Sequence, residues 1–473
     1  MKQSLSGKLK PFGQEHLLTF WDELSEPQQQ QLEAQIQSID FAQLAELYKR
    51  RSEAAEYESL AMQSGDPPAY KFSTVTDTTP VKQPKAVNVK EAVQSGEEAL
   101  RSGKVAAVLV AGGQGTRLGF PHPKGMFPVA PVSKHTLFQI HFEKVSAASK
   151  RYGNWVPLCI MTSPATDTET RTFLAENNYF GLDPNEVLIF CQGTMPAVSM
   201  EDGRVLLAEK EQIAVSPDGH GGMLAALTKG TPSVLQSLKR RGIEYLFYNQ
   251  VDNPLVRIAS PEMLGFHILS GSELTSQVIR KTKPLDKVGN IVQIGDRQQV
   301  IEYSDLPESA AKLTQPDGSL KIWAGSIAVH VFNTALLERE SKNKAALPFH
   351  IARKKVPFVD LQTGELQKPA EPNAVKFERF IFDLLPSAKN AVVIEVDSPN
   401  HYAPLKNAPG SSEFAPETVA RDIALMHTAW LKQNGVKVKD AVPVEISPLF
   451  ADSPEALQKK ELPKEITEPV FLR

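Results

Sequence analysis

Apolar residues follow two patterns along the chain, and each pattern predicts one type of secondary structure. Six runs are rich in apolar residues and predict strands buried in a sheet. They cover residues 156–162, 187–191, 245–251, 274–279, 323–332 and 392–396. Between them the apolar residues repeat at helical spacing, notably over residues 166–177, 232–241 and 261–270. Strands that alternate with helices predict an α/β sheet covered by helices on both faces.

The segments before and within this alternation have other patterns. Residues 16–51 carry apolar positions at helical spacing and predict two or three short helices. Residues 64–89 are rich in proline and threonine, so we expect an extended connector along the main domain, followed by a short helix over residues 90–101. Two strand-like runs, 290–294 and 299–303, predict a hairpin inserted in the series.

The end of the chain predicts a small separate lobe, with one strand, a helix over residues 416–434 and a proline-rich, charged tail. At 473 residues the chain exceeds the roughly 250–300 residues that a single core usually reaches. We therefore divide it into an N-terminal helical segment with the connector (1–102), a central domain (103–389) and a C-terminal lobe (390–473).

Composition narrows the class of protein. The net charge is -3, which favours neither a nucleic-acid partner nor a membrane surface. The two cysteines, Cys159 and Cys191, lie in apolar runs and predict reduced thiols rather than a disulfide. Residues 1–13 lack the apolar core of a signal peptide, and no apolar run of about 18 residues occurs. We expect a cytoplasmic protein that is a monomer or a weak homo-oligomer.

A glycine-rich loop follows the apolar run at residues 105–110 and is the strongest sign of function. It reads G-G-x-G-T-R-L-G from Gly112 and is followed by Pro-Lys-Gly at residues 123–125. Glycines let backbone N–H groups turn toward an anion, and a helix starting just afterwards would add its positive end. The spacing excludes the G-x-x-x-x-G-K-[ST] and G-x-G-x-x-G motifs, and with the latter a dinucleotide-dependent dehydrogenase. Arg117 and Lys124 suit a triphosphate, while a turn without a ligand is the alternative.

A carboxylate ends the strand predicted at residues 245–251. Asp252 stands where a sheet fold places catalytic groups, and a carboxylate there can hold Mg²⁺ against phosphate oxygens. A turn or a helix cap is the alternative reading of a lone strand-end aspartate.

Other polar positions are weaker signals. A second glycine-rich loop, residues 216–222, contains His220, which could donate to a ring or a sugar or could simply be solvated. Gln192 follows a strand, and its amide could pair with a uracil edge, although such glutamines are usually surface residues. Lys376, Lys406 and Glu302 are uninformative by composition alone.

These motifs together resemble those of the eukaryotic-type UDP-N-acetylglucosamine pyrophosphorylase family of sugar-1-phosphate nucleotidyltransferases. The resemblance runs from about Gly103 to Asn407. Besides the first loop, it includes Met161-Thr-Ser163, Tyr179-Phe-Gly181, Gln192-Gly193, Pro217-Asp-Gly219, Val251-Asp-Asn253, Val300-Ile-Glu-Tyr-Ser304 and Pro404-Leu-Lys-Asn407. It implies a Rossmann-like mixed-sheet nucleotidyltransferase core with small N-terminal helical and C-terminal lobes.

The resemblance also implies roles for individual residues. The nucleotide would be bound by Val110, Ala111, Gly112, Gly113, Lys124, Gln192, Gly219, Asp252 and Lys376, with Gln192 reading the uracil. Catalytic contacts to phosphates would come from Arg117, Lys124 and Lys406, and Asp252 would hold the Mg²⁺ cofactor. The sugar would be bound by His220, Glu302, Tyr303, Ser326 and Lys406.

The implied reaction is in-line attack of a sugar-1-phosphate on the α-phosphorus of UTP, which yields a UDP-sugar and pyrophosphate. The sequence departs from the family in two places: asparagine is usual where this chain has His220, and an Asn-Ala-Gly-Asn run is usual where it has Trp323-Ala-Gly-Ser326. Because a pocket that loses a hydrogen-bonding group can change its selectivity, glucose- or galactose-1-phosphate is an alternative to N-acetylglucosamine-1-phosphate. A non-catalytic UDP-sugar-binding protein is the alternative from another class.

Overall fold

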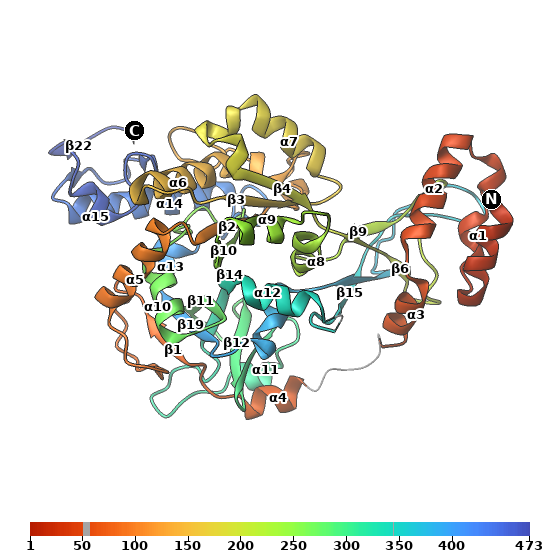
Figure 1. Ribbon diagram of the computed structural model, residues 1–473, viewed down its shortest axis with the longest axis horizontal. Helices are drawn as coiled ribbons and strands as arrows, with labels where there is room; N and C mark the ends of the chain where they lie inside the picture. The colour runs from red at the N-terminus through yellow and green to blue at the C-terminus, as the bar shows by residue number, and fades with distance from the viewer. Residues whose placement is uncertain (51–56, 344) are drawn as a thin grey trace. The chain divides into compact units, whose positions relative to one another are not determined.

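The computed structural model describes residues 1–50, 57–343 and 345–473 (Figure 1). The last residue of the helical pattern predicted over 16–51 lies outside the described residues. The chain forms two compact units, each built from several segments of the sequence. The smaller unit comprises Met1–Ala55, Gln192–Met223 and Leu347–Asp383, and the larger unit comprises Glu56–Cys191, Leu224–Ala346 and Leu384–Arg473. The three-part division at residues 102/103 and 389/390 stays a prediction beside these two units.

A mixed sheet forms the centre of the larger unit, with the strand order β1-β19-β11-β14-β10-β2-β3-β4. Strand β14 is antiparallel to both neighbours, while the remaining pairs along this order are parallel. The strands are β1 (Ala69–Lys71), β2 (Val105–Val110), β3 (Leu158–Thr162), β4 (Val187–Cys191), β10 (Tyr245–Gln250), β11 (Leu274–Arg280), β14 (Ala324–Asn333) and β19 (Val392–Val396). The predicted hairpin is β12 (Gly289–Ile294) with β13 (Arg297–Ile301), and it extends from β14.

Both faces of this sheet are buried, as the apolar runs predict. In β2 the alternate residues Val105, Ala107 and Leu109 join the main core on one face, while Ala106 and Val108, on the other face, are equally inaccessible. The predicted α/β fold with a mixed sheet is confirmed. The connector prediction also holds, because β1 lies within residues 64–89 and pairs with β19 at the edge of the sheet.

Each helical pattern predicted in the larger unit coincides with a helix, and further helices occur between them. They are α4 (Tyr57–Gln63), α5 (Val89–Arg101), α6 (Leu137–Tyr152), α7 (Asp167–Glu176), α8 (Gly222–Thr228, which begins in the smaller unit), α9 (Val234–Arg240), α10 (Pro261–Ser270), α11 (Glu308–Ala311), α12 (Thr334–Ser341), α13 (Ser398–His401), α14 (Pro416–Gln433) and α15 (Pro454–Leu457). Strands β20 (Lys437–Val438), β21 (Val444–Ile446), β22 (Glu465–Ile466) and β23 (Val470–Leu472) complete the C-terminal region, which has a small apolar core of its own.

Helices α5 and α10 pack closely, and a glycine on each helix makes this possible (Figure 1). A Cβ atom added to Gly265 would lie 1.6 Å from the backbone oxygen of Ala92, and one added to Gly96 would lie 1.9 Å from that of Pro261. Contacts so short do not exist between real side chains and backbone, so the two helices approach as near as their main chains allow.

Gly265→Ala is expected to lower the free energy of unfolding by about 3 kcal/mol, because the added methyl group forces the two helices apart. Urea unfolding followed by circular dichroism measures this change. The matched control is Gln94→Ala, on an exposed position of α5, with an expected change within about 0.5 kcal/mol. An unfolding midpoint in Gly265→Ala equal to that of the control would contradict the packing argument.

Helix α6 is the main element of the larger unit that the sequence patterns missed. Thr136 caps it by accepting a hydrogen bond from the Gln139 amide, and Gly153 ends it in the left-handed conformation. Its side chains His141 and Lys144 hold the loop after β10: His141 Nε2 lies 3.0 Å from the Val251 oxygen. Lys144 donates to the carbonyl oxygens of residues 254 and 256.

The smaller unit contains helices α1 (Lys2–Leu9), α2 (Glu26–Ser38) and α3 (Phe41–Lys49), of which α2 and α3 occupy the predicted helical segment. Its strands are short: β5 (Thr194–Pro196), β6 (Val198–Ser199), β7 (Leu207–Glu209), β8 (Gln212–Ile213), β9 (Val215–Pro217), β15 (His350–Lys354), β16 (Phe358–Val359), β17 (Leu366–Gln367) and β18 (Ala374–Glu378). The helices and strands share one apolar core.

Within the described ranges, none of the helices is both long enough and apolar enough to cross a bilayer. Cys159 and Cys191 are reduced thiols, as predicted.

Candidate active site

The first glycine-rich loop leaves the carboxyl end of β2, beside the end of β10. The two strands are parallel, with Gln250 opposite Val110, so both chains leave the sheet at the same edge. Gly112 packs against Ser163, whose hydroxyl donates to the Gly112 oxygen at 2.7 Å. Gly113 is exposed, and an added Cβ there would meet nothing within 4 Å. The loop therefore offers open backbone on one side and is fixed to the sheet on the other.

The expected helix directly after this loop is absent. The chain instead makes two short 3₁₀ turns, η5 (Thr116–Leu118) and η6 (Lys124–Met126), and the next α-helix, α6, begins at Leu137. The reason is that the loop folds back on itself, with the Lys124 amide donating to the Gly113 oxygen at 3.0 Å. Any anion at this loop is therefore stabilised by backbone N–H groups and side-chain cations rather than by a helix terminus.

Lys124 lies partly buried at this edge of the sheet. Its Nζ donates to the backbone oxygen of Leu405 at 3.3 Å. Burial lowers the pKa of Lys124; the carboxylate of Asp252 opposes this, and the charges of Lys406 and Arg117 add to it. These four side chains, predicted separately from the sequence, thus interact electrostatically in one place.

Lys406 reaches the same place from the segment before α14. The Leu405 amide donates to the Asp252 backbone oxygen at 2.8 Å, and the Lys406 amide donates to the Phe414 oxygen at the same distance. Burial opposes the charge on Lys406, but Asp252, Tyr402 and Glu302 together raise its pKa. The side chain is consequently a stable cation, with its Nζ 5.8 Å from the centre of the Tyr402 ring.

Asn253 is a residue that sequence reasoning did not single out. Its side chain donates to the His401 oxygen at 2.8 Å and accepts from the Ala403 amide at 3.2 Å. It is 2% exposed. This side chain therefore ties the segment that carries Lys406 to the loop that carries Asp252. The only signal in the sequence was its place in Val251-Asp-Asn253.

Asp252 is buried just after β10, and its carboxylate interacts electrostatically with both lysines. Groups of three or more His, Cys, Asp or Glu side chains able to hold a metal are absent from the described part of the chain. Mg²⁺ commonly uses one or two protein carboxylates and completes its shell with water and substrate phosphates. Asp252 fits a metal of that kind, shared with phosphate oxygens, and does not fit a site made of protein ligands alone.

Two of the residues predicted to bind a sugar also meet here. Gly289 and Ser326 are paired across β12 and β14, and a Cβ on Gly289 would lie 3.1 Å from Glu302 Oε1. Glu302 is also among the groups that raise the pKa of Lys406. Tyr303, next along the chain, is 49% exposed. The structure thus brings Glu302, Ser326 and Lys406 together, while their role in sugar binding stays a prediction.

The remaining predicted residues, Gln192, Gly219, His220 and Lys376, belong to the smaller unit. Gln192 is buried directly after β4, and Lys376 lies on β18, where burial lowers its pKa. Gly219 has φ +82°, and an added Cβ would lie 2.3 Å from the Arg379 oxygen, so only glycine fits there. Their roles in nucleotide binding stay predictions.

His220 is held by aromatic neighbours. Its Nδ1 accepts a hydrogen bond from the Ile381 amide at 3.2 Å, and its ring stacks on Phe380 with centroids 5.2 Å apart. Burial, assisted by His350, lowers the pKa of His220 to about 4. The ring is therefore neutral near pH 7, and the acceptor Nδ1 implies that the proton is on Nε2.

Comparison with known proteins identifies a family that this chain matches. The model of the UTP–glucose-1-phosphate uridylyltransferase family matches residues 52–441. The chain is 35% identical over 501 residues to the human UDP-N-acetylhexosamine pyrophosphorylase-like protein 1, covering 100% of this chain and 97% of the relative. It is 35% identical over 462 residues to the UDP-N-acetylglucosamine pyrophosphorylase of Saccharomyces cerevisiae, covering 94% of both.

A solved structure gives the same result for the fold. The uridine diphosphate N-acetylglucosamine pyrophosphorylase from Trypanosoma brucei superposes with a TM-score of 0.80 at 25% identity, covering 100% of this chain and 98% of that one. The resemblance noted in the motifs is confirmed over the full length.

Proposed function

Because the chain belongs to the UTP–glucose-1-phosphate uridylyltransferase family, we propose that it transfers the uridylyl group of UTP to a sugar-1-phosphate and releases pyrophosphate. The observation that carries this proposal is the grouping of Lys124, Lys406 and Asp252 beside an open glycine loop at the carboxyl edge of β2 and β10. A protein that only bound a UDP-sugar would not need the cations that hold a leaving pyrophosphate.

The chemistry asks the protein to position two anions and to neutralise their charge. An oxygen of the sugar-1-phosphate attacks the α-phosphorus of UTP in line with the departing pyrophosphate, without a covalent intermediate. Lys124 and Arg117 hold the phosphates of UTP, and Lys406 neutralises charge as the bond to the leaving group lengthens. Asp252 would hold the metal, for which we propose Mg²⁺, and a metal bound there would neutralise phosphate charge.

The predicted nucleoside contacts are part of the same proposal. Gln192 pairs with the uracil, and Gly219 together with residues 110–113 lies against the nucleoside. Lys376 neutralises phosphate charge. A cytoplasmic location and a monomeric or weakly associating state are also proposed, on composition alone.

N-acetylglucosamine-1-phosphate is the proposed sugar substrate, because the yeast relative is named for it. Ser326 and His220 weaken that preference, since both stand where the resembling family usually has a carboxamide. A serine hydroxyl has one donor, whereas an asparagine side chain offers a carbonyl acceptor and two N–H donors for an acetamido group. Glucose- and galactose-1-phosphate therefore remain the alternatives, and selectivity is to be measured rather than assumed.

The test is pyrophosphate release from UTP and Mg²⁺ with the 1-phosphates of N-acetylglucosamine, N-acetylgalactosamine, glucose and galactose in parallel. We expect the highest kcat/KM with N-acetylglucosamine-1-phosphate, and no release without metal. Faster release with glucose- or galactose-1-phosphate would overturn the sugar assignment and keep the reaction. Silence with all four, alongside measurable UTP binding, would favour the non-catalytic alternative.

A further inference from the structure

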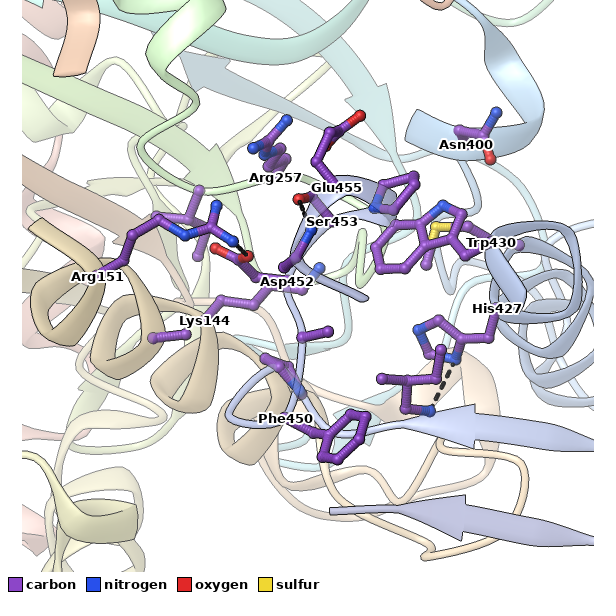
Figure 2. A pocket seen from close by; sticks show the side chains of 18 of the residues that line it. Lys144, Arg151, Arg257, Asn400, His427, Trp430, Phe450, Asp452, Ser453 and Glu455 are labelled. Carbon is purple, nitrogen blue, oxygen red and sulfur yellow. Dashed lines mark hydrogen bonds and ion pairs between the residues drawn. The ribbon is translucent and has the colours of Figure 1, made fainter. Parts of the chain in front are cut away.

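A large cavity lies in the larger unit, away from the glycine loop (Figure 2). Its volume is about 1200 Å³, which exceeds the usual range for small-molecule sites of about 300–1,000 Å³. Its walls come from α6, from the loop after β10, and from α14 and the segment around α15. The fold therefore leaves a space of ligand size between the main sheet domain and the C-terminal lobe.

Arg257 supplies a charge to this cavity that interacts electrostatically with Glu262 and Tyr152, without a hydrogen bond or ion pair to either. The side chain is partly buried, yet it donates no hydrogen bond and forms no ion pair with any residue in the described ranges. A guanidinium has five N–H donors, and leaving them without acceptors in a partly desolvated place is unfavourable. An anion that reached Arg257 would supply two parallel acceptors.

Most carboxylates of the cavity wall already have an ion-pair or hydrogen-bond partner. Asp452 pairs with Arg151, and Glu97 pairs with Arg101. Glu445 accepts from two backbone amides and the Ser133 hydroxyl, and Glu262 accepts from the amide and hydroxyl of residue 73.

Among the described charges that line the cavity, the uncommitted cations exceed the uncommitted carboxylates. Arg257 is joined by the exposed Lys150 and Lys459, whereas Glu455, also exposed, is the carboxylate left without a partner. The lining as a whole carries seven Lys and Arg side chains against five Asp and Glu, so the charge facing the cavity is positive, and an anion would be favoured there.

Apolar groups line the part of the cavity near α14. Ile423, Met426 and Trp430 follow one another at helical spacing along α14 and all line the cavity. Trp430 is partly exposed, and Figure 2 shows its indole ring among the lining side chains together with Arg257 and Lys144. A ligand with a charged group and a flat or apolar remainder would use both kinds of wall.

From this arrangement we infer that the cavity binds a small phosphate monoester with an apolar or ring-shaped remainder, the phosphate on Arg257 and the remainder against Trp430 and Met426. No catalytic step is assigned to it. The site is distinct from the residues grouped around Asp252.

The same loop connects this site to Asp252. Arg257 lies five positions after Asp252, and Lys144 of α6 donates to the carbonyl oxygens of Pro254 and Val256 between them, the latter at 2.8 Å. Burial lowers the pKa of Lys144 to about 7, and Asp452 opposes the shift. The hydrogen bonds from Lys144 to the loop therefore depend on the charges near this lysine. A phosphate on Arg257 therefore acts on the loop that positions Asp252, and we expect it to change the turnover described under the proposed function, on which this regulatory part rests.

Phenyl phosphate is the probe, because it carries a phosphate and one aromatic ring. Isothermal titration of the full-length protein is expected to give a Kd on the order of 1 mM, which is typical of a small fragment. Arg257→Gln should weaken binding at least about tenfold, since it removes the charge-assisted pair of hydrogen bonds. Arg240→Gln, an exposed arginine on α9, is the matched control and should bind like the wild type.

Lys124→Ala separates this site from the glycine loop and should leave the affinity for phenyl phosphate unchanged. The inference is overturned if the wild type shows no binding up to about 10 mM. It is also overturned if Arg257→Gln binds as the wild type does, or if Lys124→Ala loses binding instead. The titration needs no turnover, so a failure of the proposed function would not be mistaken for a failure of the site.

Turnover gives the second measurement. Phenyl phosphate at saturation should change the kcat/KM for pyrophosphate release in the wild type and in Arg240→Gln, and not in Arg257→Gln. Binding without any change in turnover would overturn the regulatory part.

Discussion

Lys124→Ala is expected to lower kcat/KM for uridylyl transfer by about 10²–10³-fold and to leave the fold intact. The Nζ of Lys124 lies at the edge of the sheet where the glycine loop, Asp252 and Lys406 meet. Because it is partly buried, its charge acts through a medium of lower polarity than water and stabilises phosphate charge strongly. The fold should survive, since the hydrogen bond that is lost is a long one to a single carbonyl oxygen.

Steady-state pyrophosphate release measures the change, and circular dichroism checks the fold. Lys432→Ala, an exposed lysine on α14, is the matched control and should keep the wild-type rate. Lys124→Arg tests charge against shape: it should recover part of the rate, because the cation is kept in a bulkier form. A wild-type rate in Lys124→Ala would remove Lys124 from the site and weaken the assignment of the whole glycine loop.

The sheet could be predicted because strands that are buried on both faces are rich in apolar residues. Strands β4 and β19 coincide with the predicted runs 187–191 and 392–396, and both are apolar from end to end or nearly so. The position of Asp252 followed from the same logic, since ligands gather where strands end. Features that depend on a single strand and the loop after it could therefore be predicted from the sequence.

Helix α6 escaped prediction because polar residues occupy its buried face. Four polar residues are buried there: His141, Glu143, Ser146 and Ser149. They interrupt the spacing of apolar residues from which helices are predicted. Two of them have partners on distant elements: His141 Nε2 lies 3.0 Å from the Val251 oxygen, and Glu143 accepts a hydrogen bond from Ser447. Both partners are more than a hundred residues away in the chain, so no local sequence pattern indicates them.

The strands of the smaller unit could not be predicted for a related reason. Strand β6 has two residues, and its Val198 pairs with Val375 of β18. Strands this short show no alternation of apolar and polar residues, and their stability comes from pairing with strands that are distant in the sequence. The cavity could not be predicted either, because Arg257 and Trp430 line the same space only in the folded chain.

Asp252→Asn is expected to lower kcat by about 10³-fold, because it removes the proposed metal ligand and the anion that balances two lysines. The side chain keeps its shape, and its backbone oxygen can still accept from the Leu405 amide, so the segment that carries Lys406 should stay in place. Asp440→Asn, at an exposed position, is the matched control and should keep the wild-type rate.

The pH dependence separates the electrostatic role of Asp252 from a purely structural one. Its carboxylate raises the pKa of Lys124 against burial, and it contributes to the raised pKa of Lys406. Removing that negative charge lowers both pKa values, so the lysines lose their protons at a lower pH than in the wild type. The alkaline limb of the kcat/KM profile of Asp252→Asn should therefore move to lower pH, and the Mg²⁺ concentration for half-maximal rate should rise. A lower rate with an unmoved alkaline limb would mean that Asp252 does not set the charge of the lysines, whereas an unchanged rate would refute its place in the site altogether.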